Sequence, residues 1–204
     1  MKHPTLRTIG GASIIQNLQS KQTALLVIDF QNEYFDGLLP IPDAMTALKN
    51  AKNLIEYADE NAIAVFHVQH IAPQGSATFA QDSAMSAFHS DILPAPHHKI
   101  VQKNMPSVFA SSDIDMQLKA SSINTLIICG LMTHMCVSAA AREAIPLGYN
   151  IVVAEDACAT RSIDFNNEDT IDYTTLHKAS LVTLNDAFGD VMTVNQIINL
   201  ECKS

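Results

Sequence analysis

Short apolar runs alternate with segments of helical periodicity along the chain. Runs of strand length lie at residues 24–30, 62–68, 99–102, 125–130, 150–156 and 180–184. This alternation is typical of a parallel sheet that is covered by helices on both faces. The pattern therefore predicts an α/β fold with a doubly wound, six-stranded parallel sheet, formed as a single domain over residues 1–204.

Helical segments are expected between these strands. After the first strand, apolar residues recur at helical spacing from Ala44 to Ala58, and Asp43 stands where it can cap the helix. A brief helix is expected over 113–120, and a helix rich in small residues over 133–148. The remaining prediction is a helix near 167–179 and a last amphipathic helix that carries Val191, Val194, Ile197 and Ile198.

Residues 71–98 break the alternation. They contain prolines, Gly75 and several histidines and serines. We interpret them as a long, partly helical excursion over the sheet, because insertions of this kind often shape substrate pockets.

Charge and cysteine content narrow the classes of function. The 204 residues carry 12 Lys and Arg against 21 Asp and Glu, a formal charge of -9, which disfavours nucleic acid or anionic membrane as the main partner. The N-terminal segment has no signal-peptide core, and no apolar run is long enough to span a bilayer. The four cysteines lack metal-site spacing. We expect a cytoplasmic protein with reduced thiols, a small-molecule substrate, no metal and no cofactor.

Three reactive side chains follow predicted strands at their carboxyl ends. Asp29 ends the first strand, Lys103 follows the third, and Cys136 lies near the start of the helix after the fourth. Taken singly they could be a capping carboxylate, a surface lysine and an inert buried cysteine. A parallel sheet brings such strand ends together, and this is the edge at which ligands bind in open α/β sheets.

The three residues together suggest acid–base and nucleophilic chemistry. Asp29 is a candidate general base, and Lys103 could keep Asp29 ionised and stabilise negative charge on a reacting group. Cys136 is a candidate nucleophile. A helix N-terminus favours thiolate, so we predict a thiol that reacts below the usual pKa of about 8.5.

The sequence motifs around these residues resemble those of the isochorismatase-like cysteine hydrolase family. The matching segments are ALLVIDFQNEYF, KNMPSVF and CGLMTHMCVSAAAREAIPLGYNIVVAEDACAT. Their order and spacing agree from about residue 24 to 184, and the third segment is the most specific.

The resemblance implies a catalytic triad of Asp29, Lys103 and Cys136 that hydrolyses C–N bonds of small amides through a thioester. It also implies an oxyanion hole made by the backbone N–H groups of Met132 and Cys136, with a cis peptide between Leu131 and Met132. Members of the family are commonly dimers or larger, so we expect a homo-oligomer, a dimer or tetramer.

The chain departs from parts of this family. Nicotinamidases carry an Asp-x-His metal motif, whereas this sequence has no histidine between His3 and His67, so nicotinamide is disfavoured as the substrate. Two alternatives stay open. One is an isochorismatase-type vinyl-ether hydrolase in which the thiol is dispensable, and the other is a non-catalytic binding protein of the same fold.

The histidines and aromatic residues suggest a pocket lining. His67 and His70 are three apart on a strand, so they face opposite sides and are poorly placed to share a metal. His97 and His98 are interpreted as surface residues. The residues expected to line the cleft are Phe35, His70, Phe79, Phe109, Thr133 and His134.

Overall fold

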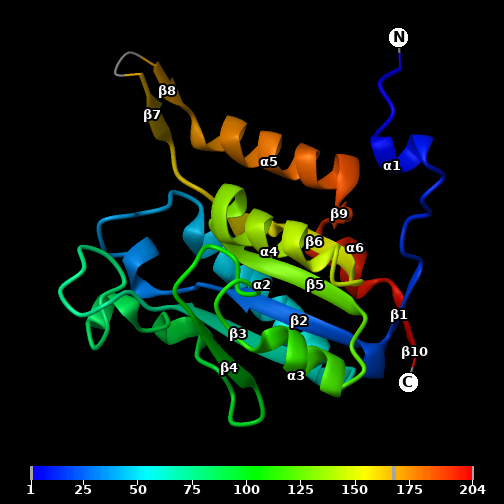
Figure 1. The fold of residues 1–204 in the computed structure, drawn as a ribbon, viewed down its shortest axis with the longest axis horizontal. Helices are drawn as coiled ribbons and strands as arrows, with labels where there is room; N and C mark the ends of the chain where they lie inside the picture. The colour runs from blue at the N-terminus through cyan, green and yellow to red at the C-terminus, as the bar shows by residue number, and fades with distance from the viewer. Residues whose placement is uncertain (1, 167–168, 204) are drawn as a thin grey trace.

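The central element is a six-stranded parallel sheet, seen in a computed structural model that describes residues 2–166 and 169–203 (Figure 1). The strand order is β4-β3-β2-β5-β6-β9, with every neighbouring pair parallel. The predicted fold class is confirmed. The strands are β2 (Thr23–Ile28), β3 (Ala64–His70), β4 (Lys99–Lys103), β5 (Thr125–Leu131), β6 (Asn150–Ala159) and β9 (Asp190–Met192).

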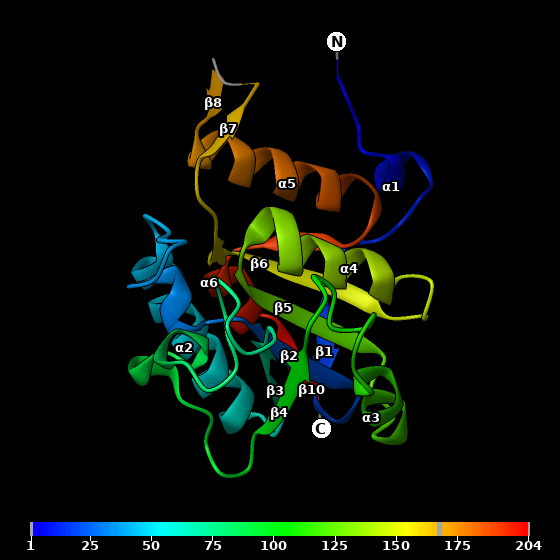
Figure 2. The same cartoon turned by 60° about the vertical axis from the view of Figure 1, so that its left-hand side comes forward.

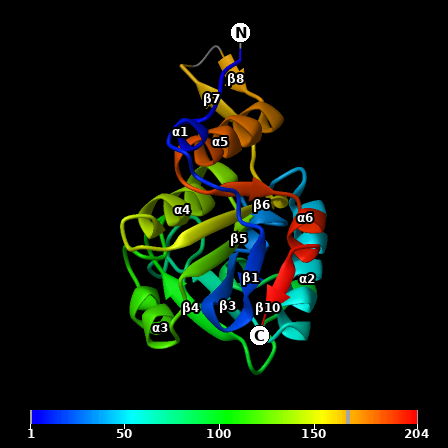
Figure 3. The same cartoon turned by 90° about the vertical axis from the view of Figure 1, so that its right-hand side faces the viewer.

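Helices cover both faces of the sheet (Figures 2 and 3). On one face lie α2 and α6, and on the other lie α3, α4 and α5 (Figure 3). The helices are α1 (Leu6–Ile9), α2 (Ala44–Glu60), α3 (Ile114–Ala120), α4 (Ser138–Ala144), α5 (Tyr173–Ala187) and α6 (Val194–Ile198).

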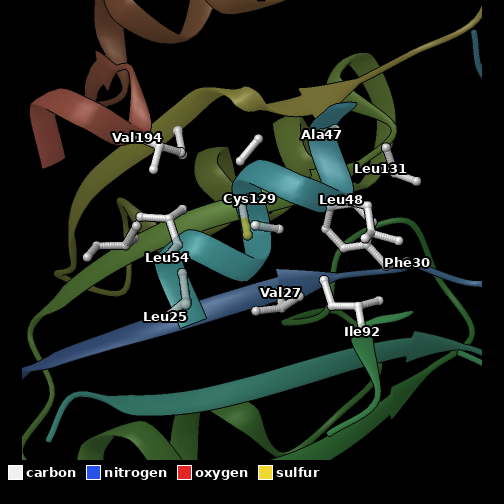
Figure 4. Packing of buried hydrophobic residues seen from close by; sticks show 14 of the residues in the cluster. Leu25, Val27, Phe30, Ala47, Leu48, Leu54, Ile92, Cys129, Leu131 and Val194 are labelled. Carbon is white, nitrogen blue, oxygen red and sulfur yellow. The ribbon is translucent and has the colours of Figure 1, made fainter. Parts of the chain in front are cut away.

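The strands separate two hydrophobic clusters because successive side chains point to opposite faces. In β2, Leu25 and Val27 pack beneath α2 with Leu48 and Leu54 (Figure 4). Leu26 and its alternate neighbours belong to the other cluster, with residues of α3, α4 and α5. Burial of one such aliphatic side chain contributes about 1.5–3 kcal/mol, so the sheet is fixed from both sides.

One predicted strand is wrong. Residues 180–184 lie inside α5, where Leu181 and Leu184 are buried three residues apart and Val182 is exposed. That is helical spacing, which a short apolar run can mimic. The sixth strand is instead β9, so Val191 is a strand residue and the last helix begins only at Val194.

The other predicted helices differ at their ends. The helix expected near 167–179 starts at Tyr173, and residues 167–168 lie outside the described part of the chain. The segment predicted as a helix over 133–148 begins with a π-helical turn, Thr133–Val137, and its α-helix ends at Ala144. Asp43 occupies the N-cap of α2, but its side chain makes no capping hydrogen bond.

Two small pairings lie outside the predicted sheet. Near the chain ends, β1 (Asn17–Gln19) pairs in parallel with β10 (Glu201–Lys203). A hairpin of β7 (Ile163–Phe165) and β8 (Asp169–Ile171) projects beyond α5 (Figures 1 and 2). The described elements are completed by four 3-10 turns: Ser20–Gln22, Asn32–Tyr34, Ala84–Ser86 and Ser90–Ile92. Residues 71–98 form the expected excursion, which is mostly irregular and includes two of these turns.

Among the residues described, no helix combines the length and apolar character needed to cross a membrane.

Gly130 allows β5 to lie close to β2. Its φ is +141°, and an added Cβ would lie 2.2 Å from the Ile28 carbonyl oxygen. Gly130→Ala should therefore lower the free energy of unfolding by about 2–6 kcal/mol, from backbone strain plus the clash. Denaturant unfolding measures this change.

Gly75→Ala is the matched control. Gly75 also has positive φ (+82°), but an added Cβ would meet nothing within 4 Å. The cost should be only about 1–2 kcal/mol, from the backbone alone. An equal decrease in the free energy of unfolding in the two variants would contradict the close approach of β5 to β2 at Gly130.

Candidate active site

Asp29, Lys103 and Cys136 converge at the carboxyl ends of the central strands. Lys103 Nζ lies 2.7 Å from Asp29 Oδ2 and 3.4 Å from Cys136 Sγ. The Asp29 and Lys103 side chains are fully buried, and Cys136 is 5% exposed. The three candidates thus meet as the strand-end argument predicts.

Asp29 directly follows β2 in a constrained backbone position. Its φ is +53°, a conformation that is uncommon for a residue other than glycine. Its N–H donates to the Val68 carbonyl at 2.9 Å, and its own carbonyl accepts from Gln31 N at 2.8 Å. These bonds fix the direction in which the carboxylate leaves the sheet.

Gln31 joins the segment after β2 to neighbouring elements. Its side-chain amide donates to the carbonyls of His70 (2.8 Å) and Ser86 (2.6 Å) and accepts from His70 N (2.8 Å). Gln31 is fully buried, so loss of these partners would leave unpaired polar groups. The residue therefore holds the end of β3 against the Asp29 loop.

Cys136 lies in the π-helical turn Thr133–Val137 that follows β5. The turn is closed by Val137 N, which donates to the Met132 carbonyl at 3.3 Å. π-Helical turns are often found at functional sites. The peptide between Leu131 and Met132 is cis, as the resemblance implied, and the oxyanion-hole roles of Met132 and Cys136 stay a prediction.

Burial and the charges around Cys136 shift the pKa of its thiol in the direction opposite to that expected. Burial and the neighbouring Asp29 carboxylate raise the pKa of Cys136 to about 12, while Lys103 acts to lower it. The predicted low-pKa thiolate is therefore wrong in direction. Desolvation is the largest of these effects, and the adjacent anion adds to it.

Lys103 stays charged in spite of its burial. Burial acts to lower the pKa of Lys103, but the Asp29 and Cys136 groups outweigh this effect and raise it. Among the described residues, neither Asp29 carboxylate oxygen has a partner that meets the angular criteria of a hydrogen bond. The 2.7 Å contact with Lys103 is therefore an ion pair. The carboxylate oxygens can therefore still accept a proton.

His70 lies next to Lys103 across the β3–β4 pair. Its Nδ1 is 3.0 Å from Lys103 Nζ, so the ammonium donates to a neutral imidazole. Burial and the Lys103 charge both lower the pKa of His70. His70 thus contacts the candidate triad through Lys103 and contributes to holding the lysine in place, and its role in substrate binding stays a prediction.

Phe79 and Tyr34 form an aromatic group beside His70. The Phe79 ring centroid is 5.2 Å from that of Tyr34 and 5.1 Å from that of His70, both edge-on. Buried Glu33 accepts from Phe79 N at 3.2 Å and from Leu38 N at 2.7 Å. The expected pocket residue Phe79 is thus fixed close to Lys103 through His70.

The side chains of Thr133 and His134 are engaged by polar partners. Thr133 Oγ1 is 2.8 Å from His177 Nδ1, and His134 Nδ1 is 2.6 Å from Thr160 Oγ1. His177 and Thr160 also line a cavity of about 100 Å³. Both predicted residues belong to the turn that carries the cysteine, and their role in substrate binding stays a prediction.

The two remaining predicted lining residues pack elsewhere. The Phe35 ring lies 4.3 Å from His89 and packs against the cluster beneath α2. Phe109 lies 5.9 Å from the Tyr149 ring and packs against the opposite cluster. Among the described residues neither has a ring contact with a triad member, so their role in substrate binding stays a prediction.

Tyr34 and Arg161 lie near the candidate site, and the sequence reasoning did not select either residue. Burial raises the pKa of Tyr34, as do the nearby Cys136 and Asp29, while the Arg161 charge lowers it. Arg161 follows β6 and is half-buried, and its Nε has no hydrogen-bond partner among the described residues. Its position just beyond a strand's carboxyl end is the signal that could have identified it.

A cavity of about 400 Å³ reaches Lys103 from the ends of β3 and β4. Residues of the irregular excursion form one wall, as its predicted pocket-shaping role requires. The lining residues are Ile71, Ala72, Pro73, Gln81, Gln102, Lys103, Asn104 and Ser111.

The four cysteines are free thiols, as expected. His97 is exposed, with 67% of its side chain accessible, but the His98 side chain is only 3% exposed. The surface prediction is therefore wrong for His98. The His98 ring is covered because it contacts Ala95 within its own turn. It also contacts His67 and Asp59, which are distant in sequence.

A buried carboxylate, ammonium and thiol at the carboxyl edge of a six-stranded parallel sheet define an α/β hydrolase site. Residues 23–196 match the family model of the isochorismatase domain. The chain belongs to the isochorismatase family of hydrolases.

Individual relatives agree with this assignment. The chain is 33% identical to the isochorismatase family protein YddQ of Bacillus subtilis, over 86% of this chain and 98% of that protein. It is 23% identical to a maleamate amidohydrolase of Pseudomonas putida, over 85% and 84% of the two chains. An isochorismatase structure from Pseudomonas putida superposes with a TM-score of 0.89 at 26% identity, covering 96% of this chain and 99% of that one.

Asp29→Asn should make Cys136 more reactive toward an alkylating agent. The Asp29 charge raises the pKa of Cys136 and the Lys103 charge lowers it, so loss of the anion lowers the pKa. Each pKa unit is about a tenfold change in thiolate. At pH 8, iodoacetamide should modify Cys136 at least about tenfold faster than in the wild type, as measured by peptide mass mapping.

Asp36→Asn is the matched control, because Asp36 is an exposed carboxylate in the same segment. Its alkylation rate should equal that of the wild type. A wild-type rate that titrates like an ordinary thiol, near pH 8.5, would contradict the raised pKa.

Proposed function

We propose that this protein hydrolyses a C–N bond of a small-molecule amide through a thioester on Cys136. The proposal rests on two distances: Lys103 Nζ lies 2.7 Å from Asp29 Oδ2 and 3.4 Å from Cys136 Sγ. A base, a cation and a nucleophile within this reach have the arrangement required for covalent catalysis.

In the first half of the reaction, one proton moves from the thiol to Asp29 and then to the leaving nitrogen. Asp29 accepts the thiol proton as Cys136 Sγ bonds to the amide carbon, and the carbonyl electron pair moves to oxygen. The tetrahedral species collapses when the C–N bond breaks and Asp29 returns the proton to the leaving nitrogen. Because proton transfer accompanies attack, a thiol with a pKa of about 12 needs no free thiolate.

The second half regenerates the enzyme. Asp29 accepts a proton from water, whose oxygen bonds to the thioester carbon. The C–S bond then breaks, the acid product leaves, and the sulfur regains the proton. We assign stabilisation of the oxyanion in both halves to the backbone N–H groups of Met132 and Cys136. Lys103 pairs with the Asp29 carboxylate at 2.7 Å between proton transfers.

We further propose that the substrate carries an anionic group, such as a carboxylate, that binds Arg161. The Arg161 charge acts on both Tyr34 and His134, which border the cysteine turn. An arginine with an unpaired Nε–H can bind a carboxylate in two parallel hydrogen bonds. The relative named maleamate amidohydrolase is consistent with an amide that also bears a carboxylate.

Cys136→Ala tests the proposed chemistry. On a panel of small amides, wild-type enzyme should release ammonia or amine, and the variant should lose more than about a thousandfold in kcat because the nucleophile is gone. Ammonia release and intact mass, which reveals an acyl adduct, are the measurements.

Cys202→Ala controls for a general thiol effect, because Cys202 is a half-buried free cysteine outside the site. It should retain full activity. Cleavage of a chorismate-like vinyl ether that survives in Cys136→Ala would instead favour the vinyl-ether reaction. A wild type that forms no adduct and turns over none of the amides would favour a binding protein.

Arg161→Gln tests the anionic substrate. A charge-assisted hydrogen bond contributes about 1.5–3 kcal/mol, so kcat/KM for a carboxylate-bearing amide should fall about 10–100-fold. The value for the corresponding neutral amide should stay unchanged. An equal loss on both substrates would show that Arg161 supports the fold of the site rather than the charge of the substrate.

A further inference from the structure

A second group of polar side chains lies at the opposite end of β4 from Lys103. It joins Asp59, at the end of α2, to His97 and His98 in the turn before β4. Asp59 Oδ1 lies 2.9 Å from His97 Nε2 and 3.0 Å from His98 Nε2. These three candidate ligand atoms all lie within 4.8 Å of one another. The group shares no residue with the proposed catalytic site.

We propose that Asp59, His97 and His98 bind a divalent transition-metal ion such as Zn²⁺. Two imidazole nitrogens and one carboxylate oxygen are ligands that zinc prefers. Bonds of about 2.0–2.2 Å in tetrahedral geometry place ligand atoms about 3.3 Å apart. The two Asp59–imidazole spacings, 2.9 and 3.0 Å, need to open by only a few tenths of an ångström, and the partly exposed Asp59 and His97 can provide that movement.

His98 has the support behind it that a metal-binding histidine needs. Its Nδ1 lies 3.2 Å from His67 Nε2 and 3.1 Å from Ala95 N, on the side away from Asp59. When Nε2 binds the ion, the ring proton resides on Nδ1 and can be donated to His67.

The ion-free and ion-bound states of the group differ in which histidine nitrogen carries the proton. Without an ion, Ala95 N–H donates to His98 Nδ1, and the two Nε2–H groups donate to Asp59. The ion takes the place of those protons. Asp59 Oδ1 accepts from both rings, at 2.9 and 3.0 Å, so a single carboxylate oxygen already faces both imidazole nitrogens.

The ion would act on the scaffold rather than on the substrate. The strand from Lys99 to Lys103 separates it from the candidate triad, roughly 13 Å at 3.3 Å per residue. Its ligands join the last turn of α2 to the turn that enters β4. Binding therefore clips an edge strand of the sheet to a helix and should raise the melting temperature by mass action.

The test is a titration of untagged full-length protein with zinc chloride, followed by calorimetry, in a Cys136→Ala background that removes the reactive thiol. We expect one equivalent of zinc to bind and to raise the Tm. Asp59→Asn and His97→Ala should each weaken binding at least about tenfold and abolish the Tm increase. His3→Ala is the control, because His3 is exposed and remote in sequence, and it should bind as tightly as the background.

Cobalt chloride provides a second readout. Visible d–d bands with the intensity of a four-coordinate site, without a sulfur-to-cobalt charge-transfer band, are expected and should disappear in His97→Ala. Failure of zinc to bind, or equal affinity in the background and in His97→Ala, would overturn the proposal. Because the His97 side chain is 67% exposed, that variant should fold even where Asp59→Asn does not. Circular dichroism verifies folding.

Discussion

The buried ion pair between Asp29 and Lys103 is the interaction on which the site depends. Both side chains are removed from water, and an isolated charge in either place would be costly. The pair is tolerated because β2, β4 and β5 deliver the two charges and the Cys136 sulfur to one edge of the sheet, where each charge offsets the burial of the other. The hydrophobic faces of the sheet thus supply the energy that keeps a polar centre dry.

The same pair determines the protonation of the nucleophile. An anion next to Cys136 disfavours a second negative charge, so the thiol keeps its proton until a substrate is in place. A protonated thiol is also less open to oxidation and to chance electrophiles than a thiolate. In the proposed reaction, reactivity is therefore confined to the moment when a carbonyl carbon is available, and the nearby carboxylate accepts the proton.

Much of the fold and of the triad could be predicted from the sequence because both follow from one regularity. Alternating strands and helices imply a parallel sheet, and a parallel sheet places Asp29, Lys103 and Cys136 at one edge. The direction of the Cys136 pKa could not be predicted, since it depends on burial and on the distance to Asp29. The run 180–184 was misassigned because five apolar-rich residues fit a strand or a helix, and only packing against the sheet decides. The burial of His98 depends on Asp59, which is distant in sequence.

The pairing of β1 with β10 determines where the chain ends. β10 runs parallel to β1, and β1 leads through the turn Ser20–Gln22 into the start of β2. The C-terminus consequently emerges at the amino edge of the sheet, opposite the edge that holds the triad (Figure 1). A reporter domain fused there, or a solid support attached there, would lie on the side of the sheet opposite the candidate triad.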